Sequence, residues 1–378
     1  MPIKVAVPKE IEPGERRVAM EPGVASRLLQ HGVELLMERG AADAAYYRED
    51  EFGEVRWVDN REALYGEADV VLKVQPPTEE EIGLLREGTT VVGTLLPSRY
   101  PERVAGLRDR KATSFALELI PRISRAQAMD VLSSQASVAG YKAAIMGSHL
   151  ACRFFPMLTT AAGTIRPAQV MVIGAGVAGL QAVATARRLG AVVEAYDVRS
   201  ATKDQVKSLG ARFIELSISA EGEGGYAREL SDEERRQQQE ELARYIARAD
   251  VLITTASVPG RPAPKIVTQA MVDGMKPGAV LVDLAAEGGG NCELTQPGET
   301  IEHGAVVIHA PLNVPSQVPL HASEMYAKNL YNFLSPLISD EGELAPDWDD
   351  EVVAGSLLTR DGEIKHEPTR SLVEGGQS

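Results

Sequence analysis

The sequence has few of the residues on which extracellular, membrane-spanning and metal-binding proteins depend. Among 378 residues there are two cysteines and six histidines, and neither type has the spacing of a metal site. Cys152 and Cys292 lack CxxC spacing, so we expect free thiols in a reducing cytoplasm. No apolar run approaches the roughly 20 residues that span a bilayer. The N-terminus, residues 1–4, lacks the apolar region of a signal peptide. We therefore expect a cytoplasmic protein without a metal ion.

Basic residues are also too few for a nucleic-acid-binding protein. Lys and Arg number 39 against 54 Asp and Glu, which gives a formal net charge of −15. Binding to a phosphate backbone requires a basic surface, and anionic lipid headgroups repel an acidic one. Hydrophobic residues at 44% and charged residues at 25% are ordinary for a soluble globular protein. We therefore expect neither a nucleic-acid partner nor direct membrane insertion.

Short apolar runs alternate with helical stretches along the chain, which is typical of a parallel α/β protein. A first set of strands is predicted at 3–7, 33–37, 68–72, 90–94 and 112–116. A second set is predicted at 170–173, 192–196, 212–214, 251–254, 279–282 and 305–308. A capping box at Ser231–Glu234 opens a polar helix to about residue 249. Residues 352–359 fit an edge strand or hairpin. The chain is long enough for two such α/β domains, each with a substantial core.

Two long helical runs are predicted to link the two sheets. They cover residues 125 to about 155 and residues 321–334. Because the second run returns the chain to the first sheet, we predict a discontinuous first Rossmann-like domain, 1–132 plus 320–378, and a second one, 133–319. Two crossings would leave a cleft with a hinge between the domains.

The run Val170–Leu180, VMVIGAGVAGL, carries the most specific functional signal. It predicts a buried strand, a glycine-rich turn and the start of a helix, and Asp197 ends the next apolar run. Gly174 permits the tight turn, Gly176 lets a pyrophosphate approach the backbone, and Gly179 lets the helix pack on the strand. The helix N-terminus favours phosphates. Asp197 would bind ribose hydroxyls and repel a 2′-phosphate, so the motif predicts NAD(H) rather than NADP(H).

Polar side chains are concentrated in the segment 121–135, PRISRAQAMDVLSSQ, where the predicted domains meet. If the segment were helical, Ala126 would lie near Met129 and Asp130. Asp130 would likewise lie near Ser133 and Ser134. Arg122 precedes this helix and could reach across a bound ring. Arg, Gln, Asp and Ser supply the donors and acceptors that a carboxamide requires. The segment fits either a nicotinamide site or an ordinary polar helix N-terminus with a structural Arg–Asp pair.

The same segment resembles the signature of the NAD(H)-binding component of proton-translocating NAD(P) transhydrogenase. The resemblance covers nearly the whole chain, and other motifs carry it too: VAVPKE, ERRVAMEPG, GAGVAGLQAVATARRLGA, VEAYDVRSATKDQVKSLGARF, TTASVPGRPAP, DLAAEGGGNC, NVPS and YAKNL. The opening motifs also resemble alanine dehydrogenase. The resemblance implies that the chain binds NADH and passes its hydride to NADP+ on a separate component, while a membrane-spanning component couples the exchange to proton movement.

The resemblance also implies a set of site residues. Arg122, Asp130 and Ser133 would hold the nicotinamide end, and Gln127 would reach toward the NADP side. The pyrophosphate and ribose would be bound by Gly174, Ala175, Gly176, Val177, Ala178, Gly179 and Asp197. The adenosine would be flanked by Val198, Arg199, Ala256 and Ser257, and covered by Gly225 in a mobile loop at 217–226. Finally, the family implies a homodimer. We expect the chain to be a separately encoded alpha subunit, or the first part of a split one, held by partner subunits on the cytoplasmic face of the membrane.

Alanine dehydrogenase is the main alternative. Its reaction requires a carboxylate clamp and a proton-transfer group. Arg17 and Lys73 match that family's substrate-binding residues, but 91–97, VVGTLLP, has no histidine where its catalytic histidine belongs. We therefore interpret Arg17 and Lys73 as structural ion-pair residues. A saccharopine-type dehydrogenase would lack the segment 121–135.

A non-catalytic NAD(H) sensor is the other alternative. A sensor would have no reason to place Gln127 at an exposed nicotinamide face. Arg199 is the type of residue that binds a 2′-phosphate, but Asp197 favours NAD(H).

Overall fold

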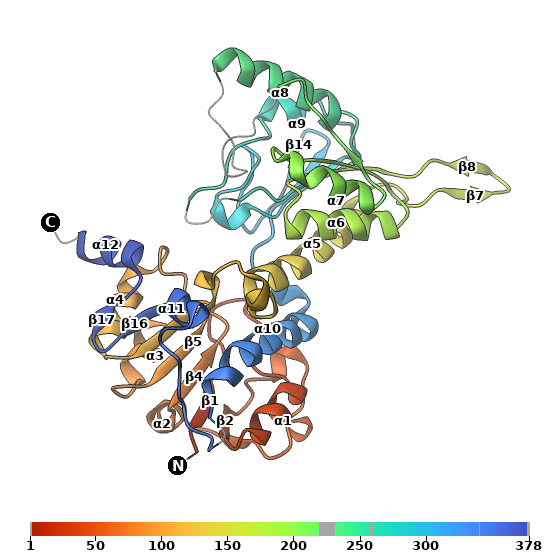
Figure 1. Cartoon of the computed structure of the whole chain (residues 1–378). Coiled ribbons are helices and arrows are strands. Elements are labelled where there is room, and N and C mark those ends of the chain that lie inside the picture. The colour runs from red at the N-terminus through yellow and green to blue at the C-terminus, as the bar shows by residue number, and fades with distance from the viewer. Residues whose placement is uncertain (1, 219–230, 258–260, 340, 376–378) are drawn as a thin grey trace. The chain divides into compact units, whose positions relative to one another are not determined.

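The chain forms two compact units in the computed structural model, which describes residues 2–218, 231–257, 261–339 and 341–375. Unit 1 contains Met1–Gln135 and Pro315–Ser378, and unit 2 contains Ala136–Val314. Each unit is built on one large, mostly parallel sheet with helices on both faces (Figure 1). The predicted fold class is therefore confirmed.

Unit 1 contains an eight-stranded sheet in the order β17-β16-β6-β5-β4-β1-β2-β3. The six strands from β6 to β3 run parallel, and β16 joins β6 in antiparallel register. The strands are β1 (Lys4–Val7), β2 (Glu34–Glu38), β3 (Arg56–Val58), β4 (Val70–Lys73), β5 (Thr90–Gly93), β6 (Thr113–Ala116), β16 (Leu357–Arg360) and β17 (Glu363–Ile364). The central strands β4 and β5 are buried along their whole length, as expected where helices cover both faces.

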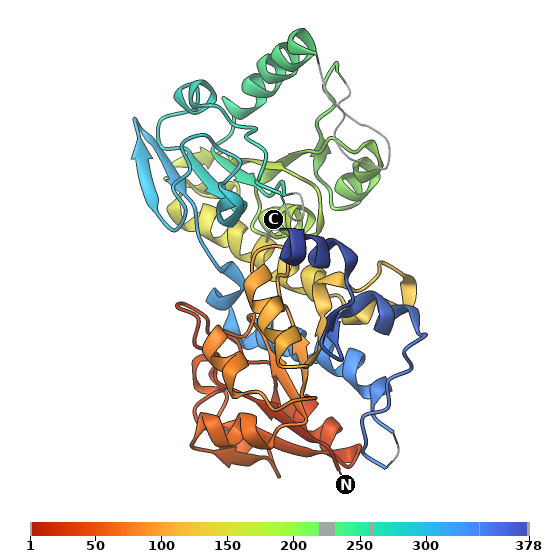
Figure 2. The same cartoon turned by 90° about the vertical axis from the view of Figure 1, so that its left-hand side faces the viewer.

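Helices cover the two faces of this sheet with separate apolar cores. One core packs beneath α1 (Pro22–Gln30), α10 (Pro319–Leu334) and α11 (Glu351–Ser356). The other packs beneath α2 (Arg61–Glu67), α3 (Glu79–Leu84) and α4 (Pro101–Asp109), which Figure 2 shows in orange in front of the sheet. The last helix, α12 (Glu367–Gly375), lies against α4.

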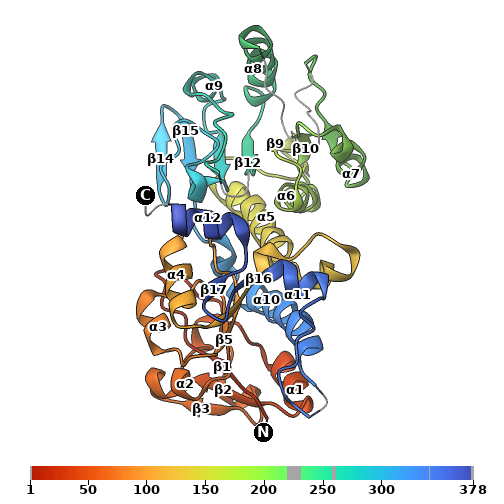
Figure 3. The same cartoon turned by 60° about the vertical axis from the view of Figure 1, so that its left-hand side comes forward.

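Unit 2 contains a seven-stranded sheet in the order β11-β10-β9-β12-β13-β15-β14, in which only β14 is antiparallel. The strands are β9 (Gln169–Ile173), β10 (Val192–Tyr196), β11 (Arg212–Phe213), β12 (Val251–Thr254), β13 (Val280–Asp283), β14 (Thr300–His303) and β15 (Val306–His309). One face is covered by α5 (Val131–Leu150), α6 (Val177–Arg188) and α7 (Lys203–Ser208). The other is covered by α8 (Asp232–Ile246) and α9 (Gln269–Asp273), as Figure 3 shows.

A two-stranded hairpin extends from unit 2, away from its sheet (Figure 1). It consists of β7 (Leu158–Thr160) and β8 (Gly163–Ile165), and every residue of both strands is exposed. Apolar side chains on and beside it are also exposed: Phe154, Met157, Leu158 and Ile165.

Every strand of the two predicted sets is present within two residues of its expected bounds. The expected helix over 125–155 is wrong in two places. A 3-10 segment, η4 (Ser124–Met129), precedes α5, and Asp130 between them has extended backbone. Helix α5 also ends at Leu150. Residues 352–356 belong to α11 and residues 357–359 begin β16, so only the last three of residues 352–359 form the expected edge strand.

Candidate nucleotide site

The strand order of unit 2 brings the glycine-rich turn and two other loops to one edge of its sheet. Strands β9 and β12 are neighbours, although the chain passes through β10 and β11 between them. This reversal of strand order is a topological switch point, where ligands bind beyond the carboxyl ends of parallel strands. Gly174 follows β9, Asp197 follows β10, and Thr255 follows β12. The structure therefore brings together the loops that carry the described predicted residues of unit 2.

The three motif glycines have different surroundings. Gly174 has φ +94°, and a Cβ there would lie 2.5 Å from Thr255 Oγ1. A Cβ on Gly179 would lie 1.7 Å from the carbonyl oxygen of Gly174, so only glycine lets α6 pack on this turn. A Cβ on Gly176 would lie 3.9 Å from Arg199 Nη2, its nearest neighbour among the described residues beyond the adjoining chain. Gly176 thus has the open side that a pyrophosphate would need.

The start of α6 follows this turn. Gly176 is the N-cap and Val177, which is exposed, is the first helical residue. The first N–H groups of an α-helix have no partner within the helix and carry the positive end of its dipole. Gly140 of α5 lies so close to Ala178 that a Cβ would be 2.0 Å from its carbonyl oxygen. These contacts fix the start of α6 beside the open side of Gly176.

The Asp197 carboxylate joins the turn to the loop after β10. Its Oδ2 accepts a hydrogen bond from the Ala175 N–H at 2.6 Å. Arg199 donates from its backbone N–H at 2.8 Å and from Nε and Nη2 at 2.9 and 2.8 Å. Burial alone would raise the pKa of Asp197, but these hydrogen bonds outweigh it and hold the pKa below its usual value. The Asp197 carboxylate is therefore ionised at neutral pH. Val198, between Asp197 and Arg199, packs against the apolar core of unit 2.

A buried asparagine holds the loop after β12. Asn291 Oδ1 accepts from the Ala256 N–H at 2.9 Å, and its Nδ2 donates to the carbonyl oxygens of Ala256 and Pro264. The backbone N–H of Asn291 donates to Asp283 at the end of β13. Ser257 beyond Ala256 is exposed. No role was predicted for Asn291, although it lies in the motif DLAAEGGGNC.

The predicted nicotinamide residues lie on one segment of unit 1. Arg122 and Gln127 are exposed. Asp130 is the N-cap of α5, since its two carboxylate oxygens accept from the backbone N–H and Oγ of Ser133 at 2.9 and 2.6 Å. Asp130 is therefore not on a helix with Ala126 and Met129, whereas those two lie on η4 and pack against the same core. An aspartate before an apolar run with serine three residues later is an N-cap signal that could have placed the boundary.

The remaining predicted site residue lies outside the described residues. Gly225 belongs to the stretch 219–230, which also contains most of the predicted mobile loop. Its role stays a prediction.

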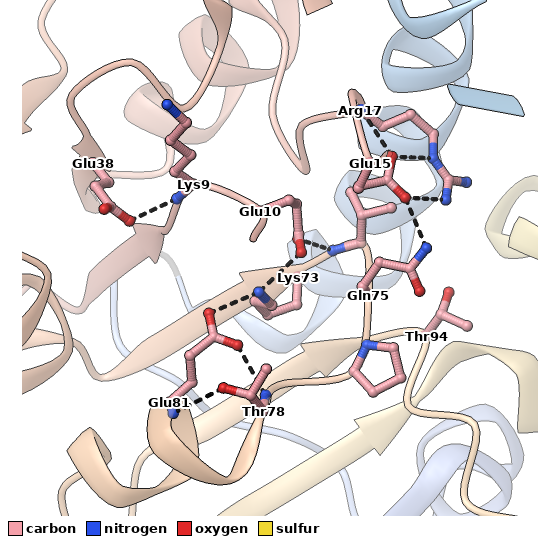
Figure 4. Close-up of polar contacts among 12 residues, drawn as sticks. Lys9, Glu10, Glu15, Arg17, Glu38, Lys73, Gln75, Thr78, Glu81 and Thr94 are labelled. Atoms are coloured by element: carbon pink, nitrogen blue, oxygen red, sulfur yellow. Dashed lines mark hydrogen bonds and ion pairs between the residues drawn. The ribbon is translucent and has the colours of Figure 1, made fainter. Parts of the chain in front are cut away.

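The equivalent edge of the unit 1 sheet is filled by ion pairs. Strands β1 and β4 form its switch point. Figure 4 shows Lys73, the last residue of β4, with its Nζ 2.9 Å from Glu10 Oε2 and 2.9 Å from Glu81 Oε1. All three side chains are buried.

Arg17 is paired in the same way. Its Nη2 lies 2.7 Å from Glu15 Oε2, and its Nη1 donates to Gln135. Glu15 also accepts from Gln75 (Figure 4). Burial would raise the pKa of Glu15, but Arg17 outweighs it, with further hydrogen bonds from Ser316 and Gln75, and lowers the pKa to about 2. Arg17 and Lys73 thus form the expected ion pairs, and their purely structural role stays an interpretation.

Glu118 predicts a pH dependence of stability. Its carboxylate accepts from the N–H groups of Leu95 and Leu96, yet burial raises its pKa to about 7. Between pH 4.5 and 7 the folded state therefore binds more protons than the unfolded state, so stability falls as pH rises through this window. Denaturant unfolding at pH 5 and pH 8 measures this decrease in the free energy of unfolding. The decrease should be smaller in Glu118→Gln than in wild type, by up to about 3 kcal/mol. An identical pH dependence in both proteins would contradict the assignment.

Unit 2 thus has the geometry of a dinucleotide-binding domain, and comparison with known proteins identifies the family. The models "Alanine dehydrogenase/PNT, N-terminal domain" and "Alanine dehydrogenase/PNT, C-terminal domain" match residues 6–139 and 143–367. The chain belongs to the alanine dehydrogenase/PNT family.

Individual relatives distinguish the two branches of this family. The chain is 47% identical to the first part of the NAD(P) transhydrogenase alpha subunit of Rhodospirillum rubrum, over 96% of this chain and 98% of that protein. It is 30% identical to the alanine dehydrogenase of Mycobacterium tuberculosis, over 97% and 95%. The crystal structure of transhydrogenase from Sinorhizobium meliloti matches with a TM-score of 0.85 at 41% identity, covering 97% of this chain and 99% of that one. The resemblance to transhydrogenase is confirmed, and alanine dehydrogenase is more distant.

Two further properties of the structure concern membranes and metals. Within residues 2–218, 231–257, 261–339 and 341–375, no helix has the length and apolar character to cross a membrane. In the same residues, no group of three or more His, Cys, Asp and Glu side chains could hold a metal ion.

Proposed function

We propose that this chain is the NAD(H)-binding component of a proton-translocating transhydrogenase and transfers hydride between NADH and NADP+ held on a partner. One contrast between the two switch points carries the proposal. In unit 2 the turn at Gly176 is open toward a ligand. In unit 1 the two cations of an amino-acid site, Arg17 and Lys73, are already bound by carboxylates. This contrast favours a nucleotide-only site over amino-acid oxidation.

The unit 2 residues fit NAD(H) as a bound substrate. The pyrophosphate would lie against Gly174–Gly179 at the start of α6, where N–H groups and the helix dipole favour phosphate. Ribose hydroxyls would bind Asp197, in exchange for side-chain bonds that Arg199 makes to it. Val198, Ala256 and Ser257 would flank the adenosine, with Gly225 covering the nucleotide. An ionised Asp197 would repel a 2′-phosphate, which supports NAD(H) over NADP(H).

The unit 1 segment would position the nicotinamide. Arg122, Asp130 and Ser133 would hold the carboxamide end, and the exposed Gln127 would face the NADP side. Hydride transfer between two nicotinamides needs no general acid or base on the protein. It needs the two C4 atoms at near-contact distance and correctly faced. A segment that offers hydrogen bonds without an activated nucleophile suits this reaction.

The proposal includes partners and an assembly. A partner component would hold NADP(H), and a membrane-spanning component would keep this chain on the cytoplasmic face and couple transfer to proton movement. The reaction class is then NAD(P)+ transhydrogenase (Si-specific/Re-specific). The extended hairpin β7–β8 supports a homodimer, because its exposed apolar side chains would be buried against a second copy.

Mixing the chain with the NADP(H)-binding component of a relative tests the proposal. We expect rapid hydride exchange between NADH and an NADP+ analogue, and tighter binding of NADH than of NADPH. Gln127→Asn should slow transfer strongly, with a much smaller loss of NADH affinity, because it shortens a side chain on the exposed face. No rate increase over the separate components would refute the proposal and leave the sensor alternative. Formation of NADH from L-alanine and NAD+ would instead support the alanine dehydrogenase alternative.

A further inference from the structure

Two asparagines of α10 hold one backbone carbonyl of η4. Asn329 Nδ2 donates to the Ala128 carbonyl oxygen at 2.8 Å, and Asn332 Nδ2 donates to the same oxygen at 3.0 Å. The two asparagines are three residues apart, so they lie on the same side of the helix. Both belong to unit 1, as does η4. The carbonyl cannot rotate without breaking both hydrogen bonds.

The residues around Ala128 are held by other contacts, and among them the side chain of Gln127 is exposed. Ala126 is buried in the unit 1 core, and Met129 packs against the same core. The Asp130 N–H donates to the Gln127 carbonyl oxygen at 3.3 Å. The Gln127 side chain itself is exposed. The backbone on both sides of Gln127 is therefore held, while its amide projects at the surface.

Stability alone does not explain an amide at position 329. Asn329 is buried, and among the described residues no donor reaches its Oδ1. A buried acceptor without a donor is unfavourable, and an apolar side chain of similar volume would avoid that penalty. What the amide contributes is the hydrogen bond from its Nδ2 to Ala128.

We infer that Asn329 and Asn332 are positioning residues for hydride transfer, acting through the Ala128 carbonyl to fix the orientation of Gln127. The inference rests on the proposed function and assigns a role to the motif YAKNL, which contains Asn329. A loosened η4 would leave NAD(H) bound in unit 2 but let the groups at the exposed nicotinamide face drift. Displacements of about 1 Å near a reacting centre can slow a reaction by up to about a hundredfold.

Leucine substitutions at both asparagines test this role. Asn329→Leu and the double variant Asn329→Leu/Asn332→Leu would be compared with wild type in the transfer reaction with the NADP(H)-binding component. We expect kcat to fall about tenfold in the single variant and further in the double variant. The dissociation constant for NADH should change by less than about threefold, because the unit 2 contacts are untouched. Amide hydrogen exchange in residues 124–130 should become faster, while the Tm of Asn329→Leu stays equal or rises.

Tyr326→Phe is the matched control on the same helix. The Tyr326 hydroxyl accepts from the Thr94 N–H and donates to the Lys73 carbonyl oxygen, away from η4. Its loss should lower Tm without slowing transfer or changing exchange in 124–130.

Four results would contradict a positioning role for the two asparagines. Unchanged exchange in 124–130, unchanged kcat in the double variant, equal slowing by Tyr326→Phe, or a parallel loss of NADH affinity would each overturn the inference. Absence of transfer in wild type would refute the proposed function instead. Exchange in 124–130 would then decide whether the asparagines fix this segment.

Discussion

Replacing Lys73 with methionine is expected to lower the free energy of unfolding by about 3–5 kcal/mol at neutral pH, because it removes the cation beside buried Glu10 and Glu81 and leaves Glu81 with the more distant Arg61, at 3.6 Å. The side chains of Glu10, Lys73 and Glu81 are all buried. Burial raises the pKa of Glu10 even with Lys73 present. At Glu81 burial also acts to raise the pKa, but the charge of Lys73 and the hydrogen bonds from Lys73, Thr78 and Tyr65 together outweigh it and lower the pKa. Methionine would fill a similar volume but would not offset either charge.

Urea denaturation of Lys73→Met and wild type measures this loss. The deficit should shrink at acidic pH, since protonation of Glu10 and Glu81 removes the unpaired charges. Lys111→Met is the control, because Lys111 pairs with Glu87 at an exposed site, where an ion pair contributes about 0–1 kcal/mol. A Lys73→Met deficit no larger than that of Lys111→Met would show that the buried ion pairs contribute little.

Alanine substitutions at Gly176 and Gly179 should both abolish tight NADH binding, but for different reasons. At Gly179 the new Cβ would lie 1.7 Å from the Gly174 carbonyl oxygen, so the turn or α6 must move. Such overpacking typically costs about 1–3 kcal/mol, and Tm should fall with the affinity. At Gly176 the methyl group would enter open space, with Arg199 Nη2 3.9 Å away, so the fold should tolerate it. It would instead occupy the place of the pyrophosphate.

Titration with NADH and thermal unfolding separate the two effects. We expect binding weaker by about tenfold or more in both variants, with Tm lowered in Gly179→Ala alone. Gly66→Ala is a suitable control, since among the described residues no atom outside its own stretch of helix lies within 4 Å of the added Cβ. Tight NADH binding by Gly176→Ala would rule out an approach of the pyrophosphate to this glycine.

The fold was largely predictable because its strands are short apolar runs between helical stretches, which is the pattern of buried parallel strands. The hairpin β7–β8 was missed, since its strands are three residues long and exposed on both faces. The break before α5 was missed because the side-chain pattern continues through Asp130. The aspartate that caps α5 by accepting from Ser133 was a signal in the sequence, but it was outweighed by that continuing pattern.

The candidate site was predictable where its chemistry is local and not where it depends on distant segments. The turn at Gly174–Gly179 and the acidic residue after β10 follow from spacing along one βαβ unit. Asn291, Asn329 and Glu81 act on partners 35, 201 and 8 residues away in sequence. The spacing of apolar residues along the sequence carries no information about such tertiary contacts.

The charge-filled edge of unit 1 also limits how this chain could be redesigned. Introducing a histidine into residues 91–97 would not by itself create an amino-acid dehydrogenase. Arg17 would still be paired with Glu15, and Lys73 with Glu10 and Glu81. Replacing those carboxylates first would leave two buried cations, Arg17 and Lys73, without their ion-pair partners. Alanine dehydrogenase activity would thus require several coupled substitutions in this chain that must be made together.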